Sequence, residues 1–331
     1  MIYIETTSKD AAFHFSVEEY IMRNYPWNEP VMMIWQTDKC AMLGNYQIAE
    51  AEIDINFARQ KEIQIVRRSS GGGTIYNDLG TFLFSLIMTW PEEQYGQQTA
   101  QKELAASVVC ALNKMKIPAM LEGRNDITVG GKKVSGRAQY ARYGRICSHG
   151  SLLYDTDLDM LTRVLRVDEE KIRSKAIRSV RSRVTNIKEH MDKPCSTMDF
   201  GRQLKQELFS GRQIREYKLT EDDLKQINQI YHERYGNPVW TFEKAPNFTF
   251  HNSKRFTGGK VEVYLDIVKG TVVSCKVRGD FLGVAAITDL EALFENKAFQ
   301  YEIFNNLFNE ISLQSYLGNI TKDEFLSCIF D

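Results

Sequence analysis

The sequence has no apolar run long enough to cross a membrane, since no window approaches the roughly eighteen consecutive apolar residues that a spanning helix needs. Its N-terminus, MIYIETTSKD, lacks the basic segment and following apolar stretch of a secretory signal. A charge excess is also missing: 42 basic and 43 acidic residues give a formal net charge of −1, whereas dedicated nucleic-acid-binding proteins usually have a clear basic excess. We therefore expect a cytoplasmic protein that binds neither a membrane nor a nucleic acid.

Cysteine is sparse and scattered. No CxxC pair and no metal-ligand spacing occurs among the six cysteines, which are Cys40, Cys110, Cys147, Cys195, Cys275 and Cys328. At this density they are typical of reduced thiols in a cytosolic protein. No histidine or cysteine neighbours His149 at ligand spacing, so we expect no metalloprotein site.

The chain has 331 residues, 43% of them hydrophobic and 26% charged, which suits one large domain followed by a smaller one. Helical spacing of apolar residues predicts helices at residues 11–25, 97–116, 157–172 and 220–235. Strand-like segments occur at residues 31–36, 61–70, 81–90, 127–129 and 151–155. The segment 81–90 is almost continuously apolar, which predicts a strand covered on both faces.

The pattern changes after Trp240. Residues 246–280 alternate between apolar and polar side chains, with Gly-Gly and Lys-Gly turn signals, which predicts a short antiparallel meander. Two helical segments, near 288–311 and 321–329, follow it. We place a domain boundary at about 242–247, around Pro246.

Three glycines follow a predicted strand in RRSSGGGTIYNDLG, residues 67–80. Gly71–Gly73 allow positive φ angles and a close approach of the backbone to a ligand, and successive N–H groups can surround an anionic oxygen. Arg67 and Arg68 add fixed positive charge for a phosphate or carboxylate. The segment is neither a P-loop nor GxGxxG. On spacing alone, a structural bulge or turn is the commoner explanation.

A second informative segment is GRNDITVGGKKVSGRAQY, residues 123–140. Asn125 and Asp126 offer hard oxygen ligands suited to Mg²⁺. Lys132 and Lys133 follow two glycines in a turn between two predicted strands. Such a turn is usually a plain hairpin, but a lysine aimed into a pocket can hold a carboxylate and a phosphate together while charge shifts between them.

The third segment, SHGSLLYD, places His149 before Gly150 and an apolar strand. A lone histidine in this position is more often structural than catalytic.

In this order the three segments resemble the lipoate–protein ligase family. That family has an RRxSGGG-type loop followed by an apolar–aromatic pair and Asp-Leu-Gly, then GRND with a lysine in KxSG, then a His-Gly-(Thr/Ser)-Leu-Leu strand. The matching residues are Arg67–Gly80, Gly123–Gly136 and His149–Leu153. Residues 171–187 are similar to the family's basic segment, and residues 255–283 to its C-terminal accessory domain, so the resemblance covers nearly the whole chain.

The resemblance implies a mixed α+β fold similar to the biotin ligase catalytic domain. It implies a catalytic domain at residues 1–244 and a small α+β accessory domain at residues 246–331. The implied activity is ATP- and Mg²⁺-dependent conversion of lipoate to lipoyl-AMP, followed by transfer of the lipoyl group to a lysine of a carrier domain. The implied carriers are the H protein of glycine cleavage, or a protein like it, and the E2 subunits of the 2-oxoacid dehydrogenases. We take a monomer as the default.

The resemblance also implies roles for individual residues. Lys133 matches the catalytic lysine that binds both the lipoate carboxylate and the α-phosphate. The implied ATP and lipoyl-AMP contacts are Arg68, Gly73, Thr74, Ile75, Tyr76, Asn125, Asp126 and Lys133. The implied lipoate contacts are Arg68, Gly72, Lys133, His149 and Gly150. Asp126 is the implied Mg²⁺ ligand.

Three residues depart from the family pattern. Asn77 stands where a histidine is common, Arg137 where a small or polar residue is usual, and Ala176 where glycine is usual. We expect Arg137 to narrow the mouth of the pocket or to change its charge. Either change would affect which carrier or which acyl chain the protein accepts.

A basic stretch at residues 163–183 holds eight basic side chains against three acidic ones. A solvated helix face explains most such runs. The alternative is a docking surface for the acidic face of a carrier.

Three other functions remain open from the sequence. An ATP-independent lipoyl or octanoyl transferase would need an activated cysteine, and Cys147 is the one near the motifs. Biotin ligation is disfavoured because the GRGRxG-like loop is missing. A non-catalytic lipoate-binding protein would retain the pocket alone.

Overall fold

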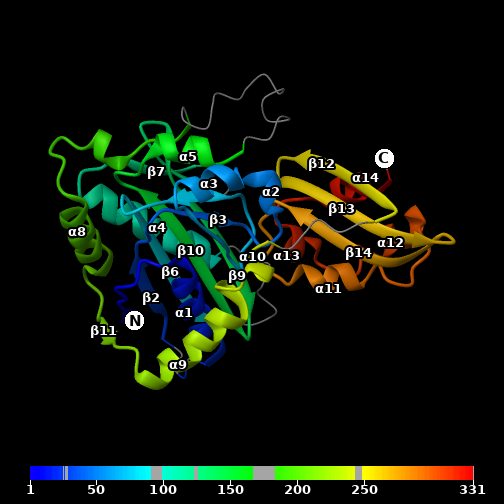
Figure 1. The fold of residues 1–331 in the computed structure, drawn as a ribbon, viewed down its shortest axis with the longest axis horizontal. Coiled ribbons are helices and arrows are strands. Elements are labelled where there is room, and N and C mark those ends of the chain that lie inside the picture. The colour runs from blue at the N-terminus through cyan, green and yellow to red at the C-terminus, as the bar shows by residue number, and fades with distance from the viewer. Residues whose placement is uncertain are drawn as a thin grey trace.

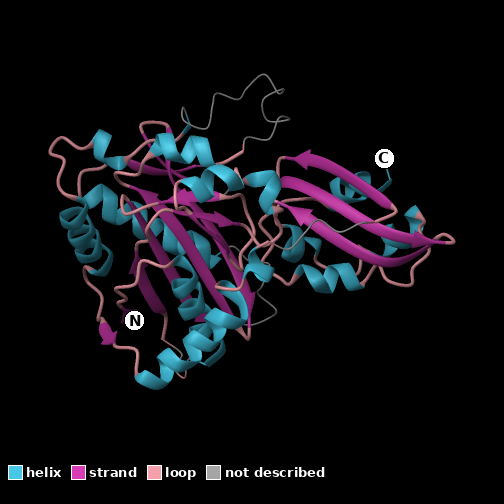
Figure 2. Ribbon diagram, viewed as in Figure 1, coloured by secondary structure: helices cyan, strands magenta, loops and turns pink. Residues whose placement is uncertain are grey.

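The computed structural model describes residues 1–24, 26, 29–90, 99–122, 126–166, 183–242 and 248–330. The ribbon shows a large sheet flanked by helices and, beside it, a small three-stranded sheet with its own helices, formed by the C-terminal part of the chain (Figure 1). The mixed α+β fold class is thereby confirmed, and Figure 2 shows both kinds of element in each part. Among the described residues, none of the helices combines the length and apolarity that crossing a membrane demands.

The large sheet has eight strands in the order β11-β1-β2-β6-β10-β9-β8-β7. In chain order these strands are β1 (Ile2–Ile4), β2 (Val31–Trp35), β6 (Thr81–Thr89), β7 (Ala119–Glu122), β8 (Asp126–Val129), β9 (Lys132–Arg142), β10 (Arg145–Leu153) and β11 (Arg215–Tyr217). Strand β1 runs parallel to both of its neighbours, and the other pairs are antiparallel.

Helices cover both faces of the large sheet. Leu83 and Ile87 of β6 pack into the hydrophobic cluster of helix α1 (Ala11–Asn24). The alternate residues Phe82 and Phe84 pack into the cluster of helices α4 (Thr99–Lys114) and α8 (Thr197–Phe209). The prediction of a strand buried on both faces at 81–90 is therefore confirmed.

One face of α1 is covered by a helix pair. Helix α9 (Glu221–Ile230) begins with a capping box between Thr220 and Asp223 and continues into η3 (Tyr231–Tyr235). The segment η3 is π-helical, because the N–H of Gly236 donates to the carbonyl of Tyr231 at 2.8 Å, five residues back.

A second sheet carries the glycine segment. Its order is β4-β3-β5, with β3 (Cys40–Leu43), β4 (Gln64–Arg67) and β5 (Ile75–Asn77), so that residues 68–74 form the connection between β4 and β5. We call these residues the glycine loop. The short elements around this sheet are α2 (Ala49–Glu52), α3 (Ile55–Gln60), α5 (Leu158–Val164), η2 (Ile187–His190) and α10 (Pro238–Thr241).

The C-terminal part is the predicted meander followed by helices. Strands β12 (Phe250–Phe256), β13 (Gly259–Val268) and β14 (Thr271–Gly279) are antiparallel in that order. Both turn residues between β13 and β14, Lys269 and Gly270, have positive φ, as a tight hairpin turn requires. The helices that follow are α11 (Ile287–Ala292), α12 (Tyr301–Leu307), α13 (Leu313–Leu317) and α14 (Lys322–Phe330).

Several element boundaries differ from those predicted. The segment near 288–311 contains two helices, α11 and α12, and α13 was not predicted. Strand β10 begins at Arg145, six residues before the expected start. Polar residues such as Ser148 and His149 hide the pattern, because they are buried as part of a polar site. Most of the basic stretch and of the expected boundary segment, residues 167–182 and 243–247, lies outside the described residues.

The two parts meet at the glycine loop. The N–H of Gly72 donates to the carbonyl of Phe281 at 3.0 Å, and the N–H of Gly279 donates to the carbonyl of Tyr46 at 3.0 Å. The rings of Tyr46 and Phe281 stack with their centroids 4.9 Å apart. A Cβ on Gly71 would come within 2.4 Å of the Phe281 carbonyl oxygen, so only glycine allows this close approach.

Candidate active site

A cavity of about 150 Å³ lies between the glycine loop and strands β6, β9 and β10. One group of lining residues is apolar: Phe15, Trp35, Met42, Ile75 and Leu83. A second group is polar or cationic: Arg68, Thr74, Lys133, Arg137, His149 and Ser151. The cavity thus combines an apolar wall with a cationic one, as a fatty acid with an anionic head requires.

Lys133 is the second residue of β9 and lines the cavity. Gly130 and Gly131 before it both have positive φ and form the tight turn that leads into the strand. Its Nζ lies 2.7 Å from Oδ1 of Asp126, and the side chain is 37% exposed. The backbone is held as well, because Thr185 donates its N–H to the Lys133 carbonyl at 3.0 Å. The ammonium is therefore fixed at the cavity by an ion pair, while Lys132 is exposed.

Arg68 is buried and organises the glycine loop. Its Nη2 donates to the carbonyls of Gly71 and Gly73, both at 2.8 Å, and its Nη1 donates to the carbonyl of Met42 at 2.9 Å. Its Nε donates to Oγ of Ser70 at 3.0 Å. Burial, together with the neighbouring charge of Arg67, lowers the pKa of Arg68 to about 10, so it stays protonated at neutral pH.

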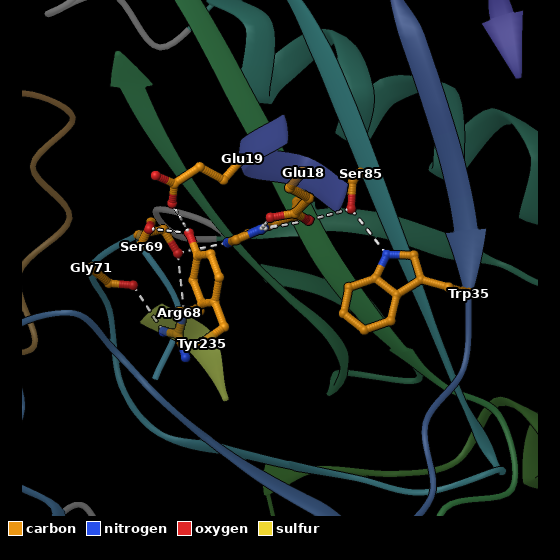
Figure 3. Close-up of polar contacts among 10 residues, drawn as sticks. Glu18, Glu19, Trp35, Arg68, Ser69, Gly71, Ser85 and Tyr235 are labelled. Carbon is orange, nitrogen blue, oxygen red and sulfur yellow. Dashed lines mark hydrogen bonds and ion pairs between the residues drawn. The ribbon is translucent and has the colours of Figure 1, made fainter. Parts of the chain in front are cut away.

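Behind Arg68, a hydrogen-bonded chain runs through the wall of the cavity. Ser70 Oγ lies 2.6 Å from His149 Nε2, and His149 Nδ1 lies 3.2 Å from both carboxylate oxygens of Glu18. Glu18 also accepts from Ser85 Oγ at 2.5 Å, and Ser85 accepts from Trp35 Nε1 at 3.0 Å, as Figure 3 shows. We call this the Ser70–His149–Glu18 chain.

The direction of the Ser70–His149–Glu18 chain follows from the tautomer of His149. An ionised Glu18 only accepts, so a neutral His149 has its proton on Nδ1. Its Nε2 then accepts from the Ser70 hydroxyl, and the Ser70 oxygen accepts from Arg68. A carboxylate on α1 therefore orients the residue that supports the glycine loop.

A second chain reaches the same loop from its other side. Oε2 of Glu19 accepts from the Tyr235 hydroxyl at 2.6 Å, which lies 2.6 Å from Ser69 Oγ (Figure 3). Burial alone would raise the pKa of Glu19, but the charges of Arg234 and Arg23 and the Tyr235 hydrogen bond lower it. Glu18 and Glu19, which are adjacent in α1, thus position Ser70 and Ser69 of the glycine loop through His149 and Tyr235.

Arg67 does not line the cavity, contrary to the expectation that it offers charge to a ligand. Its guanidinium is buried and donates to five main-chain carbonyls, those of Gly44, Asn45, Gln47, Trp240 and Thr241. The indole Nε1 of Trp240 donates back to the Arg67 carbonyl at 2.9 Å. Arg67 is a structural clamp between the 44–47 loop and α10.

Most of the expected site residues lie together. Gly72, Gly73 and Gly150 line the cavity alongside Thr74 and Ile75. The side chain of Tyr76 instead points into the hydrophobic cluster on the opposite face of β5. Asp126 contacts the lysine, and Asn125 lies outside the described residues.

The three departures from the family pattern have different surroundings. Arg137 lines the cavity and is only 6% exposed, and burial lowers its pKa against the opposing charge of Asp126. Asn77 is fully buried in β5 and does not line the cavity. Ala176 lies outside the described residues.

Cys147 is fully buried in β10 and does not line the cavity. Burial and then the nearby Glu18 carboxylate raise the pKa of its thiol well above the usual range. A nucleophilic cysteine needs the opposite conditions, namely a lowered pKa and access to the substrate. The surroundings therefore argue against a cysteine-dependent acyl transfer.

Apart from Ile75, the residues of the apolar wall were not anticipated from the sequence, and neither was Glu18. Phe15, Trp35, Met42 and Leu83 come from α1, β2, β3 and β6, whose apolar side chains look like ordinary core residues. Glu18 did carry a signal, because it lies three and seven residues after Phe15 and Ala11 on the apolar side of a helix. A buried carboxylate in such a place needs specific partners.

Comparison with known proteins agrees with this geometry. Residues 10–209 match the family model of the lipoyl protein ligase A/B catalytic domain, and residues 245–329 match that of the bacterial lipoate protein ligase C-terminus. The chain is 35% identical to the lipoate-protein ligase LplJ of Bacillus subtilis, over 100% of both chains.

Solved structures show the same fold. P. falciparum LipL1 in complex with lipoate matches with a TM-score of 0.77 at 19% identity, covering 99% of this chain and 97% of that one. A lipoate-protein ligase A bound with ATP matches at 0.63 and 25% identity, covering 73% and 97%. The lipoate protein ligase from Thermoplasma acidophilum, studied with its E2 lipoyl domain, matches at 0.64 and 26% identity, covering 75% and 98%.

Proposed function

The chain belongs to the lipoate–protein ligase family, and from that premise we propose that it converts lipoate and ATP to lipoyl-AMP and transfers the lipoyl group to a lysine of a carrier domain. The observation that carries the proposal is the cavity with an apolar wall and a fixed ammonium, that of Lys133, beside the glycine loop. We further propose that residues 1–244 form the catalytic domain and 246–331 an accessory domain, and that the protein acts as a cytoplasmic monomer.

In the first half-reaction, a lipoate carboxylate oxygen attacks the α-phosphorus of ATP. The bond to pyrophosphate breaks, and pyrophosphate leaves with the electron pair. Two anions must approach each other, and the ammonium of Lys133 offsets their repulsion. The acyl chain lies along Phe15, Trp35 and Leu83, which places the carboxylate toward the lysine.

The surroundings of Asp126 suit a magnesium ion held mainly by nucleotide phosphates. Its side chain is 34% exposed at the cavity's cationic end, and one oxygen is engaged by Lys133. Mg²⁺ commonly binds through one or two carboxylates, with phosphates and waters as the other ligands. We assign Asp126 as its protein ligand, where the ion would neutralise phosphate charge.

In the second half-reaction, the neutral amine of the acceptor lysine attacks the acyl carbonyl, and AMP leaves. We propose lipoyl domains as acceptors, either an H protein or H-like protein or the E2 subunits of 2-oxoacid dehydrogenases. The related Thermoplasma acidophilum ligase, whose fold this chain shares, was studied with an E2 lipoyl domain. Residues 184 and 185, which follow the basic stretch along the chain, contact the backbone of Lys133. We propose that the acidic face of the carrier binds the basic stretch.

Exchange of labelled pyrophosphate into ATP tests the proposed function. A ligase catalyses this exchange only when lipoate is present, because the exchange reverses lipoyl-AMP formation. A cysteine-dependent transferase and a lipoate-binding protein would both show no exchange. Exchange without lipoate, or none with it, would contradict the proposal.

KM for the acid should depend on the length of its acyl chain, because the chain packs against the apolar wall. Each methylene buried there contributes about 0.8 kcal/mol, so each one removed should raise KM for the acid about fourfold. Initial rates of exchange with octanoate, heptanoate and hexanoate would measure the slope. A flat series would show that the tail lies outside the wall formed by Trp35 and Leu83.

A further inference from the structure

Three potential metal ligands lie together behind the wall of the cavity, and of the three only His149 lines it. A carboxylate oxygen of Glu18, Sγ of Cys147 and a ring nitrogen of His149 all lie within 4.8 Å of one another, and all three residues are buried. We propose that Glu18, Cys147 and His149 bind a divalent, thiophilic cation, Zn²⁺. No motif in the sequence marks this site, because Glu18 of α1 lies 131 residues before His149.

One pair of the ligand atoms already has a separation close to that of zinc ligands. Zinc bonds of about 2.0–2.3 Å in a tetrahedral arrangement place neighbouring ligand atoms roughly 3.5 Å apart. Glu18 and His149 are already 3.2 Å apart. Ser85 donates to Glu18 and fixes the carboxylate, which is the kind of outer hydrogen bond that orients metal ligands.

The charges of the three ligands also suit a divalent cation. Zinc binding removes the thiol proton of Cys147, which leaves to solvent. The imidazole proton of His149 moves from Nδ1 to Nε2 as Nδ1 becomes a ligand. One proton is released for each ion bound, and the thiolate and carboxylate together neutralise its two charges.

A nearby polar group favours the metal-bound thiolate. The hydroxyl of Tyr140 is buried. Tyr140 pairs with Cys147 across β9 and β10, and its hydroxyl interacts with the Cys147 side chain. A thiolate at Cys147 is a stronger acceptor for this hydroxyl than the thiol is.

Bound zinc would reverse the direction of the hydrogen bond between His149 and Ser70. With its proton on Nε2, His149 donates to Ser70, whose oxygen already accepts from Arg68. The Ser70 hydroxyl proton must then turn away from His149, which changes the support of the glycine loop. We therefore expect zinc to inhibit lipoyl-AMP formation; this consequence rests on the proposed function, whereas the metal site does not.

Cobalt titration of the metal-free, substrate-free protein tests the site. Co²⁺ should bind with a near-ultraviolet thiolate-to-cobalt charge-transfer band and release one proton per ion. Cys147→Ala should lose the band. Cys40→Ala is the matched control, because Cys40 is equally buried in β3 but lies outside the cluster. Absence of the band in the native protein, or its persistence in Cys147→Ala, would overturn the site.

A second measurement does not depend on a variant that folds. X-ray absorption of the zinc-loaded native protein should show one sulfur ligand at about 2.3 Å together with nitrogen and oxygen ligands. A shell without sulfur would also overturn the site.

Activity distinguishes the two proposals. Zinc should lower lipoate-dependent pyrophosphate exchange at least about tenfold in the native protein, since a wrong imidazole tautomer can cost far more than that in an enzyme. It should have little effect on Cys147→Ala. If the metal-free protein shows no exchange at all, the ligase proposal fails while the cobalt result still decides the metal site.

Discussion

Replacing Lys133 with alanine is expected to slow lipoyl-AMP formation by about 10²–10³-fold. Removing one well-placed charge-stabilising donor typically costs about 3–4 kcal/mol in the transition state. The ammonium lines the cavity and is aimed by the ion pair with Asp126 and by the hydrogen bond from Thr185 to its backbone. Lipoate-dependent pyrophosphate exchange at saturating ATP measures this step directly.

Lys132→Ala provides the matched control. The two lysines are adjacent in β9, but successive residues of a strand point to opposite faces, and Lys132 is exposed. Its loss should leave the exchange rate close to that of the native protein. Near-native exchange in Lys133→Ala, with the folded structure retained, would remove the assigned role of this residue.

Replacing Arg67 with methionine should destabilise the fold by at least about 3 kcal/mol. Methionine fills similar space, but five main-chain carbonyls lose a donor, and of these the Gly44 carbonyl keeps the N–H of Gln47 at 3.2 Å. Each buried carbonyl left without a donor costs about 1–3 kcal/mol. For a chain of 331 residues that unfolds as one unit, an unfolding entropy of about 2.1 cal/mol/K per residue makes 3 kcal/mol correspond to a fall in Tm of about 4 °C. Thermal unfolding followed by circular dichroism would measure it.

Arg202→Met is the control for that substitution. Arg202 is 70% exposed and pairs across one helical turn with Asp199, an interaction worth about 0.3–0.5 kcal/mol. Its Tm should change little. If Arg67→Met unfolded at the native temperature, the clamp between the 44–47 loop and α10 would contribute nothing to stability.

The ordered motifs predicted the position of the site because each motif carries a local constraint. The glycines of the loop allow contacts that a Cβ would block, and the Gly-Gly turn leads Lys133 into the cavity. These requirements are readable residue by residue. The meander after Trp240 was likewise predictable, since alternation and turn residues act over a few positions.

Long-range contacts could not be predicted from one sequence. The tetrapeptide RRSS does not show that its two arginines differ in role. Arg67 donates to carbonyls of α10, whereas Arg68 supports the glycine loop, and their partners lie up to 174 residues away in the sequence. The side chain of Tyr76 was expected near the nucleotide, but the alternation of β5 turns it into the core. The pairing of Glu18 with His149 similarly depends on how α1 packs on β10.

The π-helical turn has a consequence for insertions and deletions. Removing one residue from 231–234 would let η3 continue as an ordinary α-helix, with better backbone hydrogen bonds. The same deletion would rotate Tyr235 by about 100° around the helix axis and withdraw its hydroxyl from Glu19 and Ser69. The number of residues in η3 is therefore constrained by the contacts of Tyr235 with Glu19 and Ser69, even though a deletion would relieve the irregularity of the helix.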